Sequence, residues 1–308
     1  MDLRQLNALL AVAEHGGFSA AARALHTVQS NVSTHVARLE KELGATLIDR
    51  ATGRPTKEGE AVLTRAIRIR AELEALSSDV ASLGARVAGT ARLGMIGTTA
   101  RWLAPLLFES LEEHYPEVRM VLVDATTTSL LPRVDRGDLD LAIVNLPAES
   151  MESQAEPLFD EDRILLVPPD HPLGAAPTVA LRALADYDLL LEPVGTAFRD
   201  ELDVQAAAVG VRLRARAEID GMRLLASLVI AGFGAAVLPA SAVPAVPPRA
   251  DAPWRVIAVD GLQPRTVGLA QRRRGLLSSP AAAVRDLLVD VVATGVAERP
   301  GLHPVTPT

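Results

Sequence analysis

Short polar side chains are concentrated in one segment near the N-terminus. Amide, hydroxyl and imidazole groups fall within seven positions: Gln29, Ser30, Asn31, Ser33, Thr34 and His35. Groups of these types can donate and accept hydrogen bonds at the edges of DNA bases in the major groove. Cationic side chains that could bind backbone phosphates or enter the minor groove follow at Arg38, Arg50, Arg54 and Lys57. The pattern predicts a surface that reads duplex DNA.

A second set of polar residues lies at the ends of predicted strands. In an open α/β sheet, ligands bind beyond the carboxyl ends of the strands, where helix N-termini present backbone N–H groups. That rule selects as ligand-binding candidates Thr98, Thr99, Ala100, Thr126, Thr127, Thr128, Asn145, Thr196, Phe198, Met222 and Gly234. Neutral hydroxyls beside helix starts suit a small anion such as a carboxylate. Each threonine could instead cap its own helix, and Phe198 and Met222 could be core residues.

The residue types that most enzymes and metal sites require are missing or scattered. The 308 residues contain no cysteine, which excludes disulfides, thiolate ligands and cysteine nucleophiles and favours a reducing cytoplasm. The six histidines show no metal-ligand spacing, and no G-x-S-x-G sequence is present. We therefore expect neither an enzyme nor a protein with a cofactor or a metal.

The charge distribution separates the two ends of the chain. The net charge is −7, whereas in residues 1–89 Lys and Arg exceed Asp and Glu by one. DNA binding must therefore depend on placed groups rather than on a general positive field. The basic run Arg272-Arg273-Arg274 ends a predicted strand, so we interpret it as surface or interlobe ion pairing. Asp138 and Asp140, at the start of another strand, are expected in solvent.

Three short helices and a wing are predicted to position the DNA-reading segment. A helix beginning at Asp2 places apolar residues at Leu3, Leu6, Leu10 and Ala13, and Gly16 stops it. Ser19 is expected to cap a helix over 20–25. A third helix over 29–43 has the inward residues Val32, Val36, Leu39 and Leu43. Two strands, over 46–50 and at Thr56, predict the wing.

The next segment has an apolar seam with alternating spacings of four and three residues. The seam consists of Val62, Ala66, Ile69, Leu73, Leu76, Val80, Leu83 and Val87. A helix of about 30 residues would span ~45 Å. The narrow seam favours a coiled coil with a second copy of the chain, although the helix could instead lie along its own body.

Residues beyond 89 alternate between predicted strands and helices in two successive series. This alternation predicts two lobes with parallel sheets, joined by crossings over 146–162 and 261–263. The uncharged stretch over 224–248 is interrupted by glycine and proline, so it predicts a helix, a turn and a strand rather than a membrane span. The tail from 298 is expected to be disordered.

Several runs in the N-terminal part of the sequence resemble those of a known family. The runs over 18–26, 29–33 and 38–44, followed by Leu47-Ile48-Asp49-Arg50 and Thr56-Lys57-Glu58-Gly59, look like the N-terminal signature of the LysR-type transcriptional regulators. The similarity is dense over about residues 1–65. The chain departs from the common pattern at Ser30, Thr34 and His35, which puts the base preference in question.

The resemblance implies an α/β architecture of three parts. These are a winged helix-turn-helix at 1–58, a linker and dimerisation helix at 59–88, and a periplasmic-binding-protein-like effector domain at 89–297. Lobe I would comprise about 89–161 and 264–297, lobe II about 162–263, and a disordered tail 298–308. The implied partners are dyad-symmetric double-stranded DNA, a small anionic effector, RNA polymerase and further copies of the chain, as a dimer or a tetramer. The alternative is a solute-binding module with no role in transcription.

Overall fold

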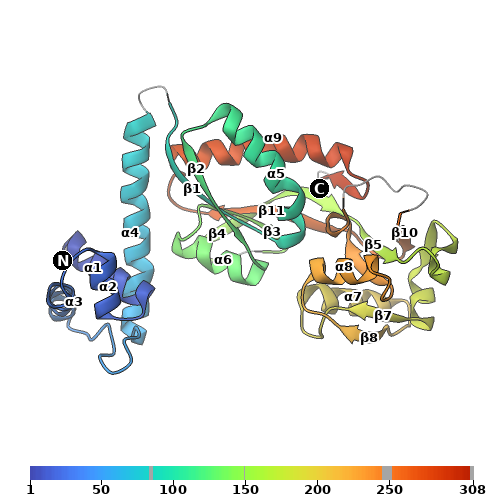
Figure 1. The fold of residues 1–308 in the computed structure, drawn as a ribbon, viewed down its shortest axis with the longest axis horizontal. Helices are drawn as coiled ribbons and strands as arrows, with labels where there is room; N and C mark the ends of the chain where they lie inside the picture. The colour runs from blue at the N-terminus through green and yellow to red at the C-terminus, as the bar shows by residue number, and fades with distance from the viewer. Residues whose placement is uncertain (83–85, 149, 245–251, 306–308) are drawn as a thin grey trace.

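The computed structural model describes residues 1–82, 86–148, 150–244 and 252–305. Figure 1 shows a helical N-terminal domain, the long helix α4, and two α/β lobes arranged one after another. The N-terminal domain and lobe II lie at opposite ends of the molecule, with lobe I between them (Figure 1).

The N-terminal domain consists of α1 (Leu3–His15), α2 (Phe18–Ala24) and α3 (Gln29–Leu43). The side chains of Asp2 and Gln5 form a reciprocal capping box at the start of α1, and Gly16, with φ 73°, ends it in the left-handed conformation. The predicted cap at Ser19 is wrong, because α2 already begins after Gly17. The predicted wing strands reduce to one antiparallel bridge between Ile48 and Pro55.

A compact apolar core fixes the angle between these helices. Leu9, Val36 and Leu39 are fully buried, as are Leu47 and Ile48 at the base of the wing. Leu43, predicted to face inward, is exposed instead, because it lies in the last turn of α3 beyond this core.

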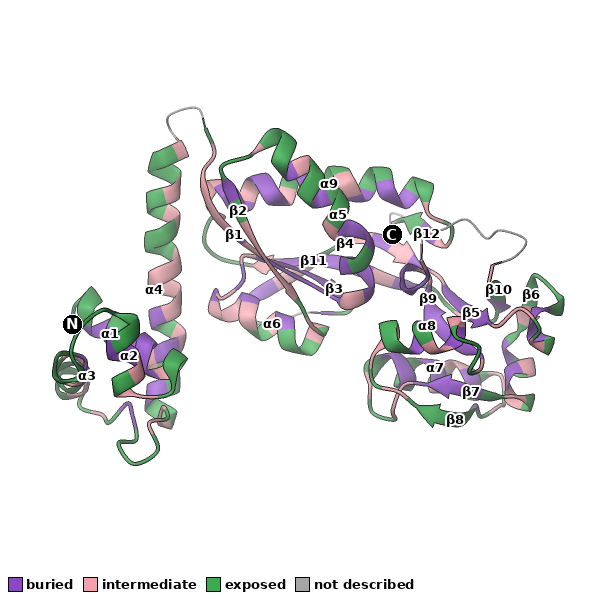
Figure 2. Ribbon diagram, in the orientation of Figure 1, coloured by how far each residue is buried: buried purple, intermediate pink, exposed green. Residues whose placement is uncertain are grey.

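Helix α4 (Lys57–Ser82) extends unbroken from the wing. Its first turns pack on the N-terminal core, and a side chain at Gly59 would place its Cβ 2.0 Å from the carbonyl oxygen of Leu47. Ala66 is 1% exposed in this core, so this member of the predicted dimerisation seam contacts its own domain. Leu83 lies outside the described residues. Figure 2 shows the change along α4 from buried to exposed residues.

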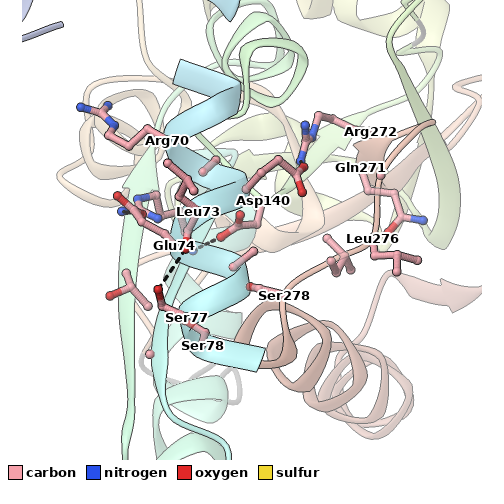
Figure 3. Close-up of a pocket in the computed structure, with 18 of the residues that line it drawn as sticks. Arg70, Leu73, Glu74, Ser77, Ser78, Asp140, Gln271, Arg272, Leu276 and Ser278 are labelled. Carbon is pink, nitrogen blue, oxygen red and sulfur yellow. Dashed lines mark hydrogen bonds and ion pairs between the residues drawn. The ribbon is translucent and has the colours of Figure 1, made fainter. Parts of the chain in front are cut away.

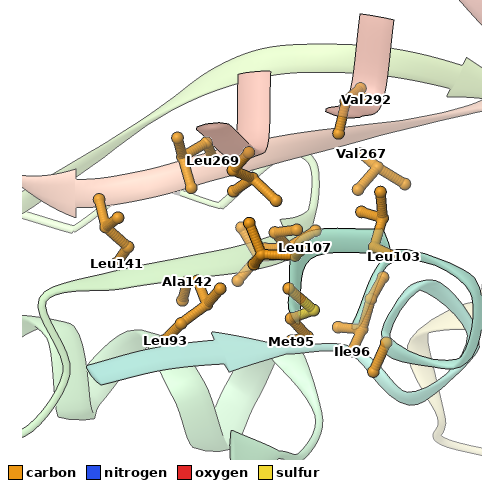
Figure 4. Close-up of a cluster of buried hydrophobic side chains, with 14 of the residues drawn as sticks. Leu93, Met95, Ile96, Leu103, Leu107, Leu141, Ala142, Val267, Leu269 and Val292 are labelled. Atoms are coloured by element: carbon orange, nitrogen blue, oxygen red, sulfur yellow. The ribbon is translucent and has the colours of Figure 1, made fainter. Parts of the chain in front are cut away.

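Lobe I is built on the larger sheet, whose order is β12-β4-β11-β3-β1-β2 in the described chain. These strands are β1 (Gly89–Met95), β2 (Val118–Asp124), β3 (Leu141–Asn145), β4 (Ser153–Glu161), β11 (Arg265–Arg272) and β12 (Leu302–Pro304). Helices α5 (Gly97–His114) and α9 (Ser279–Glu298) cover one face, and α6 (Thr127–Arg136) covers the other (Figure 1). Figure 4 shows side chains of the sheet and of α5 and α9 in one core, among them Leu93, Leu107 and Val292.

Lobe II contains a second sheet, ordered β6-β10-β5-β9, and the parallel pair β7-β8. The bounds are β5 (Arg163–Val167), β6 (Thr178–Ala180), β7 (Asp188–Leu191), β8 (Arg214–Glu218), β9 (Ala236–Pro239) and β10 (Arg255–Asp260). Helices α7 (Ala197–Ala208) and α8 (Met222–Ile230) accompany them, with short 3-10 helices at Pro172–Ala175, Leu181–Asp186 and Ala240–Ala242.

Three expectations about this region are wrong. The sheets are mixed rather than parallel, since β11 runs antiparallel to both β3 and β4. Most of the first predicted crossing is the strand β4, so the chain changes lobe only at Asp162. Leu302 of the supposed disordered tail is buried and begins a strand paired with β4, whereas 306–308 lie outside the described residues. No helix in the described ranges is long and apolar enough to span a membrane.

Candidate DNA-reading surface and interlobe cleft

The N-terminal part of α3 presents the predicted polar residues on the surface. Gln29, Ser30, Asn31, Thr34 and Arg38 are exposed. Ser33 and His35 are half-buried at the edges of this face. The buried residues of α3 lie on its other side, so the helix is held from behind while its polar face stays open.

Local hydrogen bonds limit what some of these side chains can offer to DNA. The Thr34 hydroxyl donates to the backbone oxygen of Ser30 at 2.8 Å, and Asn31 Nδ2 donates to Thr27 Oγ1 at 3.0 Å. The amide oxygen of Asn31 remains available as an acceptor. The side chain of Gln29 forms no hydrogen bond with any residue that the structure describes.

Arg50 has a bracing role that the sequence did not predict. Its guanidinium donates to Glu40 Oε2 at 2.7 Å and to Ser33 Oγ at 3.3 Å, and it lies 4.6 Å from the centre of the Phe18 ring. Arg50 therefore ties the wing to α2 and α3. By contrast, Arg54 and Lys57 are exposed and form no ion pair with any described residue, which leaves both cations available for phosphate.

Glu40 holds the base of the wing from the other side. Its Oε1 accepts hydrogen bonds from the backbone N–H groups of Leu47 and Ile48, at 2.8 and 3.2 Å. Burial of the carboxylate opposes its ionisation, but these two donors and Arg50 outweigh burial and lower the pKa of Glu40.

In lobe I the predicted ligand-binding residues meet at the carboxyl ends of β1 and β3. Thr98 and Thr99 are buried in the first turn of α5, and Thr127 begins α6. Thr127 Oγ1 accepts a hydrogen bond from the backbone N–H of Asn145 at 3.0 Å, which joins α6 to the end of β3. Two buried oxygens here, Thr99 Oγ1 and Asn145 Oδ1, have no hydrogen-bond partner in the described chain.

The threonines do not act as caps of their own helices. In the described residues, α5, α6 and α7 all begin without a side-chain cap. Thr126 Oγ1 instead lies 3.0 Å from Thr128 Oγ1, both in exposed residues, and Thr196 Oγ1 donates to the Pro193 carbonyl at 3.0 Å. Most of these hydroxyls are therefore not needed to cap the N-terminus of a helix.

Several candidates have a structural role. Ala100 belongs to the lobe I core, and Phe198 to the lobe II core. Met222 packs between the two apolar clusters of lobe II. Gly234 lies against Leu190. For Phe198 and Met222 the core interpretation, left open by the sequence, is the one that the structure supports.

Sequence reasoning missed a buried ion pair where the lobes join. Arg265 Nε and Nη2 both lie 2.7 Å from Glu161 Oε2, and Arg265 Nη2 donates to Thr98 Oγ1 at 3.1 Å. Glu161 Oε1 accepts from the backbone N–H of Ser241, which follows β9 of lobe II, at 2.6 Å. The sequence places Glu161 at the end of one strand and Arg265 at the start of another, but it carries no signal that pairs them.

Further charged residues belong to the same region. Arg223 Nη2 on α8 lies 2.6 Å from Asp124 Oδ2 at the end of β2, so an ion pair spans the lobes. Burial raises the pKa of Glu192, and the nearby charge of Asp220 acts in the same direction. In the described ranges no group of histidines and carboxylates could hold a metal ion.

Comparisons with known proteins cover both halves of the chain. A family model described as "Bacterial regulatory helix-turn-helix protein, lysR family" matches residues 3–60, and one described as "LysR substrate binding domain" matches 84–293. A probable hydrogen peroxide-inducible genes activator from Streptomyces viridosporus is 33% identical over 297 residues, covering 94% of this chain and 95% of that protein.

Solved structures agree with these matches. A cysteine-to-aspartate mutant of full-length OxyR from Pseudomonas aeruginosa is 26% identical with a TM-score of 0.76, covering 100% of this chain and 99% of the other. A cysteine-to-serine mutant of OxyR from Corynebacterium glutamicum, with H2O2 bound, is 27% identical with a TM-score of 0.59, covering 96% of each chain.

A DNA-binding helix-turn-helix joined to a two-lobed sensor domain defines a transcriptional regulator, not an enzyme. The chain belongs to the LysR family of transcriptional regulators. The alternative of a solute-binding module with no role in transcription is wrong, because the DNA-binding domain is part of the same chain.

Proposed function

We propose that this LysR-type regulator reads a dyad-symmetric DNA site with the exposed face of α3 and responds to a small anion bound between its lobes. Gln29, Asn31 and Arg38 would contact the major groove, and Arg54 and Lys57 the flanking backbone or minor groove. Arg50 positions the wing through its bond to Glu40, and because its side chain is 44% exposed its remaining N–H donors could also contact a phosphate.

The main support for an effector site in this position is the buried hydroxyl of Thr99, which has no hydrogen-bond partner in the described chain. An unpartnered buried polar group costs roughly 1–3 kcal/mol, so Thr99 Oγ1 is expected to be satisfied by a ligand. The first-turn N–H groups of α5, an 18-residue helix, lie beside it and favour negative charge. Asn145 and Thr127 complete the proposed site in lobe I.

The test is thermal unfolding of the full chain with a panel of mono- and dicarboxylates. A ligand present at 100 times its Kd should stabilise the wild type by about 2.7 kcal/mol. Thr99→Val should unfold at the same or a higher temperature when free, since it removes an unsatisfied group, yet should lose the ligand-induced shift. Thr294→Val, at an exposed position on α9, is the matched control and should respond like the wild type. A Thr99→Val variant that keeps the shift would remove this residue from the site.

The chemistry of sensing must differ from thiol oxidation. The Streptomyces relative is named for hydrogen peroxide, and the two OxyR structures described above carry a replaced cysteine. This chain has no cysteine, so neither a sulfenic acid nor a disulfide can form in it. We infer that the effector binds reversibly and without covalent reaction.

The assembly and its setting follow from the same proposal. A dyad-symmetric DNA site requires a two-fold protein, so α4 would pair two copies, and two such dimers would form a tetramer. RNA polymerase is the expected further partner, and the cytoplasm, which contains the DNA, is the expected location.

A further inference from the structure

A cavity open to solvent lies between the linker helix and lobe I (Figure 3). Its volume is about 840 Å³, which falls in the range of about 300–1,000 Å³ that small-molecule sites occupy. One wall is α4 from Arg70 to Ser78, and the other comprises β1, β11 and the segment 272–278. The cavity meets β1 at Thr90, near its amino end, whereas the proposed effector site around Thr99 lies beyond the carboxyl end of the same strand. The two sites are therefore separate.

Polar contacts hold the two walls together around the cavity. Arg92 of β1 pairs with Glu74 of α4 at 2.8 Å, and Arg272 pairs with Glu72 at 3.2 Å. At the far end, Asp79 Oδ1 accepts hydrogen bonds from the backbone N–H and the hydroxyl of Ser279, both at 2.8 Å. Of the basic run at 272–274, Arg272 thus pairs with the linker helix, whereas Arg273 and Arg274 are exposed; the surface interpretation agrees with the structure and the interlobe one does not.

The cavity is positively charged in a chain that is negative overall. Its lining contains six arginines, at 70, 92, 272, 273, 274 and 285, against the carboxylates of Glu72, Glu74 and Asp140. Arg274 forms no ion pair with any residue that the structure describes. Among the described residues, Arg70 pairs with Glu14 and Arg285 with Asp286, neither of which lines the cavity.

Burial also affects one of the three carboxylates that line the cavity. Asp140, which the sequence analysis placed in solvent, is half-buried, with its Oδ2 accepting the backbone N–H of Arg92 at 2.7 Å. Burial raises the pKa of Asp140, although this N–H and the neighbouring arginines act against burial. The arginines therefore dominate the charge that a ligand would meet.

We propose that this cavity binds a small anion carrying two or more negative charges, a polycarboxylate or a phosphorylated metabolite. Guanidinium groups hold planar carboxylates and phosphates through paired N–H donors, and Ser78 and Ser278 add hydroxyls from opposite walls. A bound anion would contact α4 and lobe I together. It would therefore stabilise the arrangement of the DNA-binding unit relative to the sensor, from a site other than the effector cleft.

The experiment is calorimetric titration of citrate and of pyrophosphate, separately, into the full-length protein at low ionic strength. We expect one saturable site per chain for at least one probe, and an affinity reduced about tenfold in Arg274→Gln. Arg274 is the most informative position to substitute, because removing its guanidinium breaks no described contact. The variant should therefore fold normally.

Three variants separate this site from the others. Arg212→Gln, which removes an exposed arginine just before β8, should bind like the wild type and controls for net charge. Thr99→Val tests the cleft and Arg54→Gln tests the DNA surface, and both should leave the affinity unchanged. Binding of citrate alone would identify a polycarboxylate site, and binding of pyrophosphate alone a phosphate site. The proposal is overturned if neither probe saturates, if Arg274→Gln binds normally, or if any control variant loses as much affinity.

Discussion

At the residue scale, the proposed DNA-binding surface depends on a carboxylate that lies at the base of the wing. Glu40 is 14% exposed at its side chain and accepts bonds from two wing N–H groups and from Arg50. The wing has only the Ile48–Pro55 bridge as regular structure, so these contacts determine its position. Arg54 and Lys57 can reach DNA only if the wing stays in this position.

Glu40→Gln should therefore destabilise the N-terminal domain by about 1–3 kcal/mol at neutral pH. The lowered pKa means that the ionised form stabilises the fold above the unfolded value of 4.5, and that this contribution is lost as pH falls through the folded pKa. The difference between wild type and variant should thus shrink below about pH 4.5. Denaturant unfolding at several pH values measures it.

The matched control is Glu60→Gln, at an exposed carboxylate of α4. It should change stability by less than about 0.5 kcal/mol. A Glu40→Gln variant as stable as this control at neutral pH would show that the wing does not depend on Glu40.

Residue types and local spacing were enough to predict α3 and its exposed polar face, because α3 begins and ends where its pattern and Gly44 predict. Contacts between distant residues were not predictable in the same way. The partners Glu161 and Arg265 are more than a hundred positions apart, and only the folded sheet brings them together. Phe198 and Met222 show a different limit, since the sequence does not distinguish a core residue from a ligand contact when an apolar residue lies at the start of a helix that follows a strand.

At the element scale, α4 divides its apolar seam between two tasks. Val62 and Ala66 pack on the N-terminal core, whereas Leu76 and Val80 are each 62% exposed and Ile69 and Leu73 are partly exposed. Exposed apolar residues at alternating spacings of three and four suit pairing with a second copy. Of the described seam, only the part from Ile69 to Val80 is therefore exposed, because Val87 lies beyond the end of α4 and packs on the core of lobe I.

The double variant Leu76→Glu/Val80→Glu should be a monomer of 32.6 kDa instead of the dimer expected for the wild type. Light scattering after gel filtration measures this mass. Buried carboxylates in a coiled-coil seam would be unpaired, while the free monomer loses little because both side chains are exposed. Val204→Glu, at a 69% exposed position on α7, is the matched control and should remain dimeric. A double variant with the mass of the wild type would place the dimer interface elsewhere.

The strands that the sequence missed share a physical cause. β4 alternates buried and exposed positions irregularly and contains Pro157 beside a register shift, so its pattern does not resemble a buried strand. β12 has three residues, and it is stabilised by pairing with β4 and by burial of Leu302 in the lobe I core, both of which are contacts between distant segments. The sheet of lobe I is mixed rather than parallel because β11, which comes from a distant segment, runs antiparallel to β3 and β4.

At the scale of the whole molecule, the sensor and the DNA-binding domain are connected by α4 and by the ion pairs that α4 makes with lobe I. Individual surface ion pairs contribute only about 0–1 kcal/mol each. An interface of such pairs can be rearranged by a ligand that binds with modest affinity, which suits a regulator. The acidic sensor domain and the nearly neutral DNA-binding part also mean that DNA affinity must come from α3 and the wing.

The most direct test of the account is fluorescence anisotropy titration of the full chain on two duplexes, at two salt concentrations. One duplex covers the region upstream of the protein's own gene, and the other has random sequence. We predict preferential binding to the first, loss of that preference by about tenfold or more in Gln29→Ala/Asn31→Ala, and no change in Arg212→Gln. Arg54→Ala should weaken binding to both duplexes equally and lower the salt slope by about 1. Equal affinity of wild type and Gln29→Ala/Asn31→Ala for both duplexes, or no binding at low salt, would contradict the assignment of α3 as the DNA-reading helix.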